Sequence, residues 1–220
     1  MSQFARLSLI LLVAVAAGCG KNGNDSVTID GSTHVTAAQP NGDVTTVNGA
    51  ISIDEKARLG AAKTVNGDIY MGAGAEAASL GTVNGAITID HGARVAGEIT
   101  AVNGTISLLE GSEAAGSLTN VNGRIVVTGA HVAGGITTVG GDIAVNSGSR
   151  IDAGVWVKNL NMGVLPAGER VPRVVIGPGA TVRGEMRFEH KVKLFVSDKA
   201  TVGSISGAEP IKYSGDTPPP

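Results

Sequence analysis

The chain has 220 residues and is rich in glycine, with 33, while aromatic residues make up 3% and charged residues 16% of it. So few large side chains exclude a thick globular core and favour a narrow interior filled by Val, Ile, Ala and Leu. The formal net charge of -2 gives no excess of basic residues, so we expect no nucleic-acid partner.

Residues 1–18 have the composition of an export signal. Arg6 precedes an apolar run from Leu9 to Ala17, which is too short to cross a membrane as a helix. A plain cleaved signal peptide is the simplest interpretation of such a segment. The one cysteine of the chain, Cys19, lies directly after it and suggests a more specific interpretation.

Ala16-Ala17-Gly18-Cys19 resembles the bacterial lipobox. The resemblance implies that the thiol of Cys19 is diacylated and that Cys19 becomes the mature N-terminus. Gly20 stands where an Asp would favour the inner membrane, so the resemblance implies an anchor in the outer membrane, at its periplasmic face. Several acyl chains suffice to hold a protein on a bilayer. Residues 19–26 then form the lipidated cysteine and a small, polar, flexible tether.

A Val-Asn-Gly sequence recurs through the middle of the chain at steps of 18 or 19 residues. A period near 18 with short apolar-alternating pieces is typical of a solenoid. Asn and Gly both tolerate positive φ, so we interpret each pair as a corner between two strands. Stacked asparagines can also pass hydrogen bonds from turn to turn. The predicted turn ladder contains Asn48, Asn66, Asn84, Asn103, Asn122 and, in an altered copy, Gly140.

Between these corners the apolar residues fall into three columns per turn, which predicts three strands on three sides of a coil. The first side alternates β-branched residues, and the second side is shorter and rich in alanine. The third side has apolar residues three apart, such as Ile99 and Val102, so we expect a bend there. The pairs assigned to the first side begin with Val27/Ile29 and continue with Ile51/Ile53, Ile69/Met71 and Ile87/Ile89.

We therefore predict an all-β protein, a single-stranded parallel β-helix with three sides and about nine turns of 18–20 residues. The β-helix is expected to span residues 27–206, with a loop at about 161–173, where two prolines interrupt the pattern. Residues 207–220 end in three prolines and are expected to form a disordered tail.

One outward position of the second side carries charges that alternate in sign over several turns. Opposite charges one strand apart support pairing in register. The alternative is a surface that binds a polyanion or an acidic glycan. The file is expected to contain His34, Arg58, Glu76, Arg94, Glu113, His131 and Arg150. A second surface file is expected from Thr46, Thr64, Thr82 and Thr138.

Catalytic and metal-binding patterns are weak in this sequence. Asp54 and Asp90 follow first-side strands, but Gly72 separates them, so paired carboxylates are not evident. No His has a nearby Ser, Cys or metal-spaced partner in sequence, and no dense carboxylate loop indicates calcium. We expect no catalytic residue, no metal and no cofactor.

Gly92–Ile99 followed by Val102–Ile106, and again Gly179–Met186, resemble the turn pattern of bactofilins, the bacterial polymer-forming cytoskeletal proteins. The resemblance covers about residues 27–206. It implies a right-handed β-helix whose copies stack end to end into filaments without nucleotide, and it carries over no catalytic residue. Thr64–Ile69 is also similar to the repeat of bacterial adhesins with β-solenoid domains.

Together these features predict a non-catalytic envelope lipoprotein. It would act as a rigid structural or polymer-forming scaffold that associates with itself end to end. The first alternative is an adhesin-like surface that binds a glycan or peptidoglycan, and the second is a β-helix enzyme that acts on polysaccharides.

Overall fold

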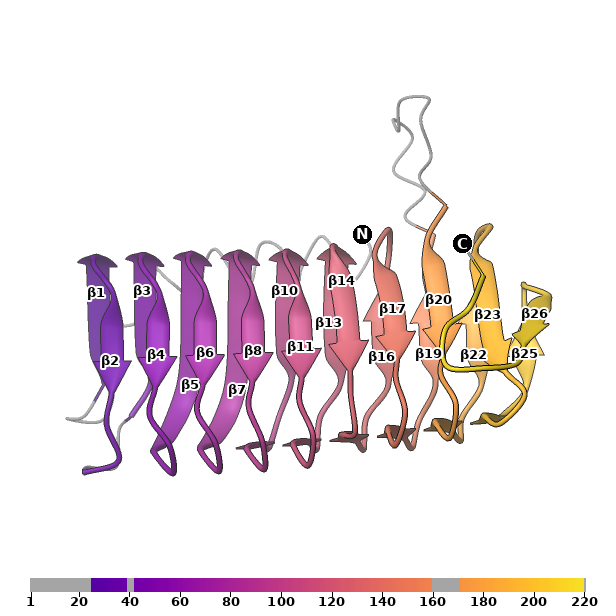
Figure 1. The fold of residues 1–220 in the computed structure, drawn as a ribbon. Helices are drawn as coiled ribbons and strands as arrows, with labels where there is room; N and C mark the ends of the chain where they lie inside the picture. The colour runs from indigo at the N-terminus through magenta and orange to yellow at the C-terminus, as the bar shows by residue number, and fades with distance from the viewer. Residues whose placement is uncertain (1–24, 39–41, 160–170, 220) are drawn as a thin grey trace.

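The computed structural model describes residues 25–38, 42–159 and 171–219, and these form an all-β solenoid of parallel strands. Figure 1 shows the turns side by side along a rod, from β1 at one end to β25 and β26 at the other. One sheet contains ten strands, one for each turn. The predicted parallel β-helix is confirmed, with about ten turns in place of nine.

The ten-stranded sheet forms the first side of the rod. Its strands are β2 (Thr33–Val35), β4 (Ile51–Ile53), β6 (Ile69–Met71), β8 (Ile87–Ile89), β11 (Ile106–Leu108), β14 (Arg124–Val127), β17 (Asp142–Val145), β20 (Arg173–Ile176), β23 (Lys193–Ser197) and β26 (Pro210–Tyr213). From β4 to β23 their inward residues, most of them β-branched or long and aliphatic, are almost fully buried.

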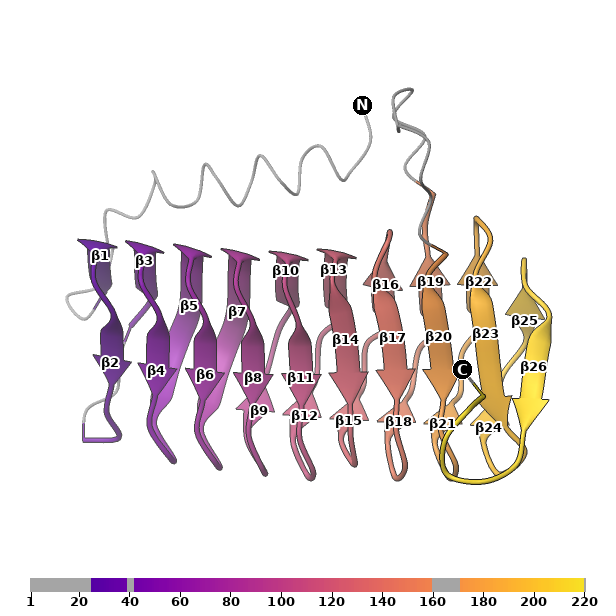
Figure 2. The same ribbon diagram turned by 45° about the horizontal axis from the view of Figure 1, so that its top comes forward.

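A bent sheet of sixteen strands forms the other two sides. The third side contains β1 (Ser26–Asp30), β3 (Val44–Asn48), β5 (Arg58–Asn66), β7 (Glu76–Asn84), β10 (Ile99–Asn103), β13 (Leu118–Asn122), β16 (Ile136–Thr138), β19 (Val155–Val157), β22 (Met186–Phe188) and β25 (Ile205–Ser206). The second side contains the N-terminal parts of β5 and β7, then β9 (Arg94–Val95), β12 (Glu113–Ala114), β15 (His131–Val132), β18 (Arg150–Ile151), β21 (Thr181–Val182) and β24 (Thr201–Val202), which Figure 2 shows in one row.

The second and third sides are continuous only in β5 and β7. Glu76 pairs with Arg94, and Leu80 pairs with Ile99, so the later turn holds one residue more between the two pairing positions. The extra residue interrupts the strand at this corner, and β9 and β10 are therefore separate.

The first turn is aligned differently from the prediction. Val27 and Ile29 were assigned to the first side, but they lie in β1, which pairs with β3 on the third side. Their exposed fractions are 52% and 68%. The first side begins with β2 instead, because Asp30 takes the corner position of Asn48 in the preceding turn.

The bend that was expected on the third side is not needed. In several turns the second inward residue is a threonine two positions after the first, and not the valine three positions after it. Thr46, Thr64 and Thr82 are at most 1% exposed, so the threonine file that was expected on the surface is buried. Their hydroxyls donate to the carbonyl oxygens of Gly31, Gly49 and Gly67 at 3.2, 3.0 and 3.0 Å. Burial of these hydroxyls is stable because each has a hydrogen-bond partner. The valines of the Val-Asn-Gly copies are only partly buried.

Glycine occupies the corner because neighbouring turns approach too closely for a side chain. A Cβ at Gly67 would lie 2.0 Å from the carbonyl oxygen of Gly49, and a Cβ at Gly85 would lie 1.9 Å from that of Gly67. Positive φ is not the general reason, since Gly104 and Gly123 adopt it but the other corner glycines do not. The same close approach recurs at Gly49, Gly104, Gly123 and Gly141.

The C-terminal boundary also differs from the prediction. The segment that was expected to be a disordered tail contains β26, which pairs with β23, and the Tyr213 hydroxyl donates to the Ile176 carbonyl oxygen at 3.3 Å. The chain then returns across β23 towards β20 (Figure 1), where Arg173 donates to the Pro219 carbonyl oxygen at 2.6 Å and covers the Phe195 ring. Arg173 already belongs to β20, and positions 161–170 of the predicted loop lie outside the described residues.

Replacing Gly85 by Ala tests the close approach. We expect a loss of about 3 kcal/mol or more in the free energy of unfolding, because the new Cβ meets a backbone carbonyl that cannot move alone. The matched control is Gly92→Ala, which has φ of +66° but no atom within 4 Å of the added Cβ, and should cost about 1–2 kcal/mol. Chemical denaturation followed by circular dichroism measures both, and equal losses would contradict the explanation.

Candidate functional site

The predicted asparagine ladder forms, and it ends on a carboxylate. Asn66 donates through Nδ2 to Oδ1 of Asn48 at 2.9 Å, Asn84 to Asn66 at 2.9 Å, and Asn103 to Asn84 at 3.0 Å. Asn122 donates to Asn103 at 3.3 Å. At the other end Asn48 donates to Oδ1 of Asp30 at 2.8 Å, a bond that the sequence analysis missed.

The direction of donation in this ladder is the same at every step, towards the N-terminal end of the rod. Each asparagine inside the ladder therefore uses both halves of its amide, one to donate and one to accept. Gly140 follows Asn122 in the ladder and has no side-chain amide. Its backbone N–H donates to the Val121 carbonyl oxygen at 2.9 Å. The ladder fixes the register of successive corners, and this is a structural role.

A continuous file runs along the second side from Arg58 to Arg150, and its charges alternate in sign from Arg58 to Glu113. Strand pairing places Arg58 beside Glu76, Glu76 beside Arg94, Arg94 beside Glu113, and Glu113 beside His131. Arg58 Nη2 lies 3.1 Å from Glu76 Oε1, and Arg94 forms a second ion pair with Glu113.

His34 does not belong to this file. It pairs with Ser52 on the first side, and its Nε2 lies 2.9 Å from Oδ1 of Asp54. The misplacement of His34 has the same cause as that of Val27, because both follow from aligning the first turn without its Asp30 corner.

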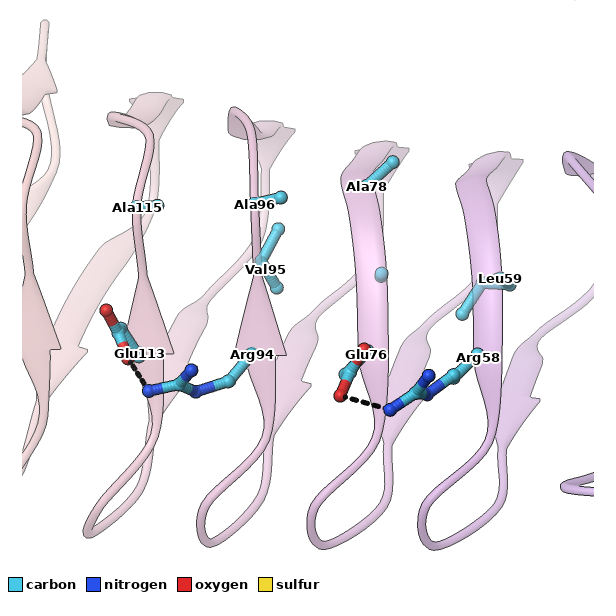
Figure 3. Close-up of a pocket in the computed structure, with 10 residues that line it drawn as sticks. Arg58, Leu59, Glu76, Ala78, Arg94, Val95, Ala96, Glu113 and Ala115 are labelled. Carbon is cyan, nitrogen blue, oxygen red and sulfur yellow. Dashed lines mark hydrogen bonds and ion pairs between the residues drawn. The ribbon is translucent and has the colours of Figure 1, made fainter.

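A groove of about 450 Å³ is bordered by four charged residues of this file, Arg58, Glu76, Arg94 and Glu113 (Figure 3). Its floor is formed by the exposed alanines two residues further along each strand, Ala78, Ala96 and Ala115. Because these side chains are single methyl groups, the rim stands above an apolar strip. The groove therefore combines two Arg–Glu pairs with a small apolar floor.

Beyond the groove the file continues into a cluster centred on Asp152. Its Oδ1 accepts from Arg150 Nε at 2.7 Å and lies 3.3 Å from Arg183, and its Oδ2 lies 2.8 Å from His131 Nε2. The hydrogen bond from Arg150, and then that from His131, lower the pKa of Asp152 to about 2. Sequence reasoning missed this cluster because Asp152 occupies the position of the floor alanines and Arg183 comes from the next turn after the irregular segment.

A second polar cluster lies on the first side. The Tyr70 hydroxyl donates to Asp90 Oδ2 at 2.6 Å, and Asp90 Oδ1 accepts from the backbone N–H of His91 at 2.7 Å and contacts its ring. The Tyr70 hydrogen bond, followed by those of His91, lowers the pKa of Asp90, and the same bond to Asp90 raises the pKa of Tyr70. Tyr70 is 45% exposed.

The remaining predicted site, Cys19, lies outside the described residues. Within the described ranges no three or more His, Cys, Asp and Glu side chains are grouped as metal ligands. Among those same residues no helix has the length and apolar character to cross a membrane.

Comparison with known proteins gives no relative: no family model, no curated protein and no solved structure matches the chain.

Asn84→Ala tests the ladder. The substitution removes one donated and one accepted hydrogen bond, so we expect a loss of about 1–2 kcal/mol in the free energy of unfolding. Asn122→Ala is the matched control, because Asn122 only donates within the ladder, and it should cost about half as much. Equal losses in urea denaturation, or none, would exclude a stabilising ladder.

The Asp152 cluster predicts a pH dependence of stability. Because the folded pKa of about 2 lies below the ordinary value near 4, the carboxylate stabilises the fold above about pH 4, and this contribution disappears as the pH falls through about 2. Asp152→Asn should therefore lower the thermal midpoint at pH 6 and leave it little changed at pH 2. Asp216→Asn, in the exposed C-terminal segment, is the control. An equal effect of Asp152→Asn at both pH values would contradict the assignment.

Proposed function

We propose that this protein is a non-catalytic lipoprotein of the bacterial envelope that serves as a rigid rod-shaped scaffold. The observation that supports the proposal most is the unbroken pairing of ten turns in register, reinforced by the asparagine ladder from Asp30 to Asn122. Such an array of short-range contacts resists bending at every turn. Most of the chain therefore forms a stiff rod whose outer surface repeats from turn to turn.

The anchor in this proposal is Cys19, through the lipobox resemblance of Ala16 to Cys19. Acyl chains on Cys19 would hold the N-terminal end of the rod at the outer membrane, on its periplasmic face.

Metabolic labelling with a palmitate analogue tests the anchor directly. The wild-type chain should take up the label, and Cys19→Ser should not, because serine offers no thiol for the diacylglyceryl group. Label absent from both chains, or equal in both, would remove the lipoprotein part of the proposal and leave the rod itself untouched.

Whether copies could also stack end to end into a polymer depends on the edge strands at the two ends of the rod. Stacking would pair the free edge of β26 with the free edge of β2 of the next copy. Pro210 of β26 has no amide hydrogen, and Lys212 stands in register with the buried Val196. Proline and lysine on an edge strand are common protections against such pairing. We therefore propose that copies do not stack end to end.

Lys212→Val tests this feature of the rod's end. Removing the ammonium group from the core column should promote stacking, so the variant should form longer particles in negative-stain microscopy, while the wild type shows rods of one length. Lys199→Val, on the exposed turn after β23, is the control for a general gain in hydrophobicity. Wild-type filaments would contradict the absence of end-to-end stacking and favour the polymer-forming scaffold.

A second candidate function is glycan or peptidoglycan binding. It is favoured by Tyr70, an exposed aromatic ring beside the carboxylate of Asp90. An aromatic ring can pack against a sugar face while a carboxylate accepts from its hydroxyls. Retention of the wild type on peptidoglycan, lost in Tyr70→Ala, would support this candidate.

A further inference from the structure

The rim of the groove has a charge pattern that is complementary to its own reverse. Along the rod it carries Arg58, Glu76, Arg94 and Glu113, one residue per turn. In the opposite direction the order of charges is minus, plus, minus, plus. We propose that this groove binds a second copy of the chain, side by side and antiparallel, so that every rim arginine faces a glutamate.

The symmetry of this arrangement is a two-fold axis that lies in the interface, perpendicular to the rod, and passes midway between Glu76 and Arg94. Rotation about this axis reverses the direction of the rod and keeps the charged file opposite the charged file. Glu76 then faces Arg94 of the second copy, and Arg58 faces Glu113. Because the same patch serves both copies, the interface is isologous and closes as a dimer.

The alanine floor fits the same arrangement. The axis places Ala78 opposite Ala96 of the second copy, and these methyl groups allow the two strand surfaces to approach closely. Both rods repeat at the strand spacing of about 4.8 Å, so all four charge pairs can align at once. A two-fold axis along the rod would instead place the charges over alanines and desolvate them without partners, which is unfavourable.

The ion pairs within one chain do not prevent these contacts. A carboxylate has about four lone-pair sites and a guanidinium five N–H donors, so Arg58–Glu76 and Arg94–Glu113 can each share their charges with a facing pair. The result is a network of eight charged groups above an apolar strip. Because all four groups are at least partly accessible to solvent in the single rod, we expect the association to weaken about tenfold when the salt concentration rises from roughly 50 to 500 mM.

Charge reversal tests both the surface and the orientation, with Cys19→Ser in every full-length chain to remove acylation. Sedimentation equilibrium should show a dimer for the parent chain and at least about tenfold weaker dimerisation for Glu76→Arg or Arg94→Glu alone, because each places like charges opposite each other. Mixing the two variants should restore a dimer, since the arginine introduced in one chain then faces the glutamate introduced in the other, and the unchanged Arg94 and Glu76 face each other. The double variant should also dimerise, because an introduced arginine then faces an introduced glutamate in both places.

The control is Lys63→Glu, which changes the net charge as Arg94→Glu does but lies on the third side, away from the groove. It should dimerise like the parent, and circular dichroism should show that all variants are folded. A parent chain that stays monomeric up to about 1 mM would overturn the proposal. So would single reversals without effect, a mixture that does not recover, or a monomer that binds polysaccharide through Arg58 and Arg94.

Discussion

The close approach of successive turns at the glycine corner is the constraint on which the rest of the structure depends. With no Cβ at Gly49, Gly67 or Gly85, each corner can lie against the carbonyl oxygen of the corner before it. This proximity brings the preceding asparagines within hydrogen-bond distance of one another and places the threonine hydroxyls on the glycine carbonyls. Register, side-chain ladder and buried polar groups thus follow from one steric fact.

An in-register solenoid repeats each outward position along its length, so its surface chemistry is organised in files. The Arg–Glu file is complementary at all four positions to its own reverse, whereas the C-terminal end of the rod carries Pro210 and Lys212, which oppose end-to-end pairing. The two proposals therefore agree: rods that resist end-to-end growth pair through their sides. In the antiparallel pair the two N-terminal turns lie five to six turns, roughly 25 Å, apart at the strand spacing. Two anchored copies would then lie lengthwise on the membrane.

The sequence predicts the parallel solenoid, the asparagine ladder and the charge file because all three repeat with the period of the turns. The prediction is wrong where a turn lacks the repeated Asn-Gly residues. Asp30-Gly31 replaces Asn-Gly, and this shifted Val27, Ile29 and His34 to the wrong side. The buried threonines were missed because hydroxyl satisfaction by glycine carbonyls is visible only in three dimensions. The groove depends on small side chains between long ones, and Asp152 gains its partners across an irregular turn.

Amide hydrogen exchange at the corners tests the central claim most directly. The N–H groups of Gly67, Gly85 and Gly104 donate to the carbonyl oxygens of Asn84, Asn103 and Asn122 in the next turn, at 3.0, 3.1 and 3.1 Å. If the corners hold the rod in register, these amides exchange as slowly as those of the adjoining strands. Corner amides that exchange as fast as exposed loops, beside protected strands, would show that the register is set elsewhere and would contradict the account.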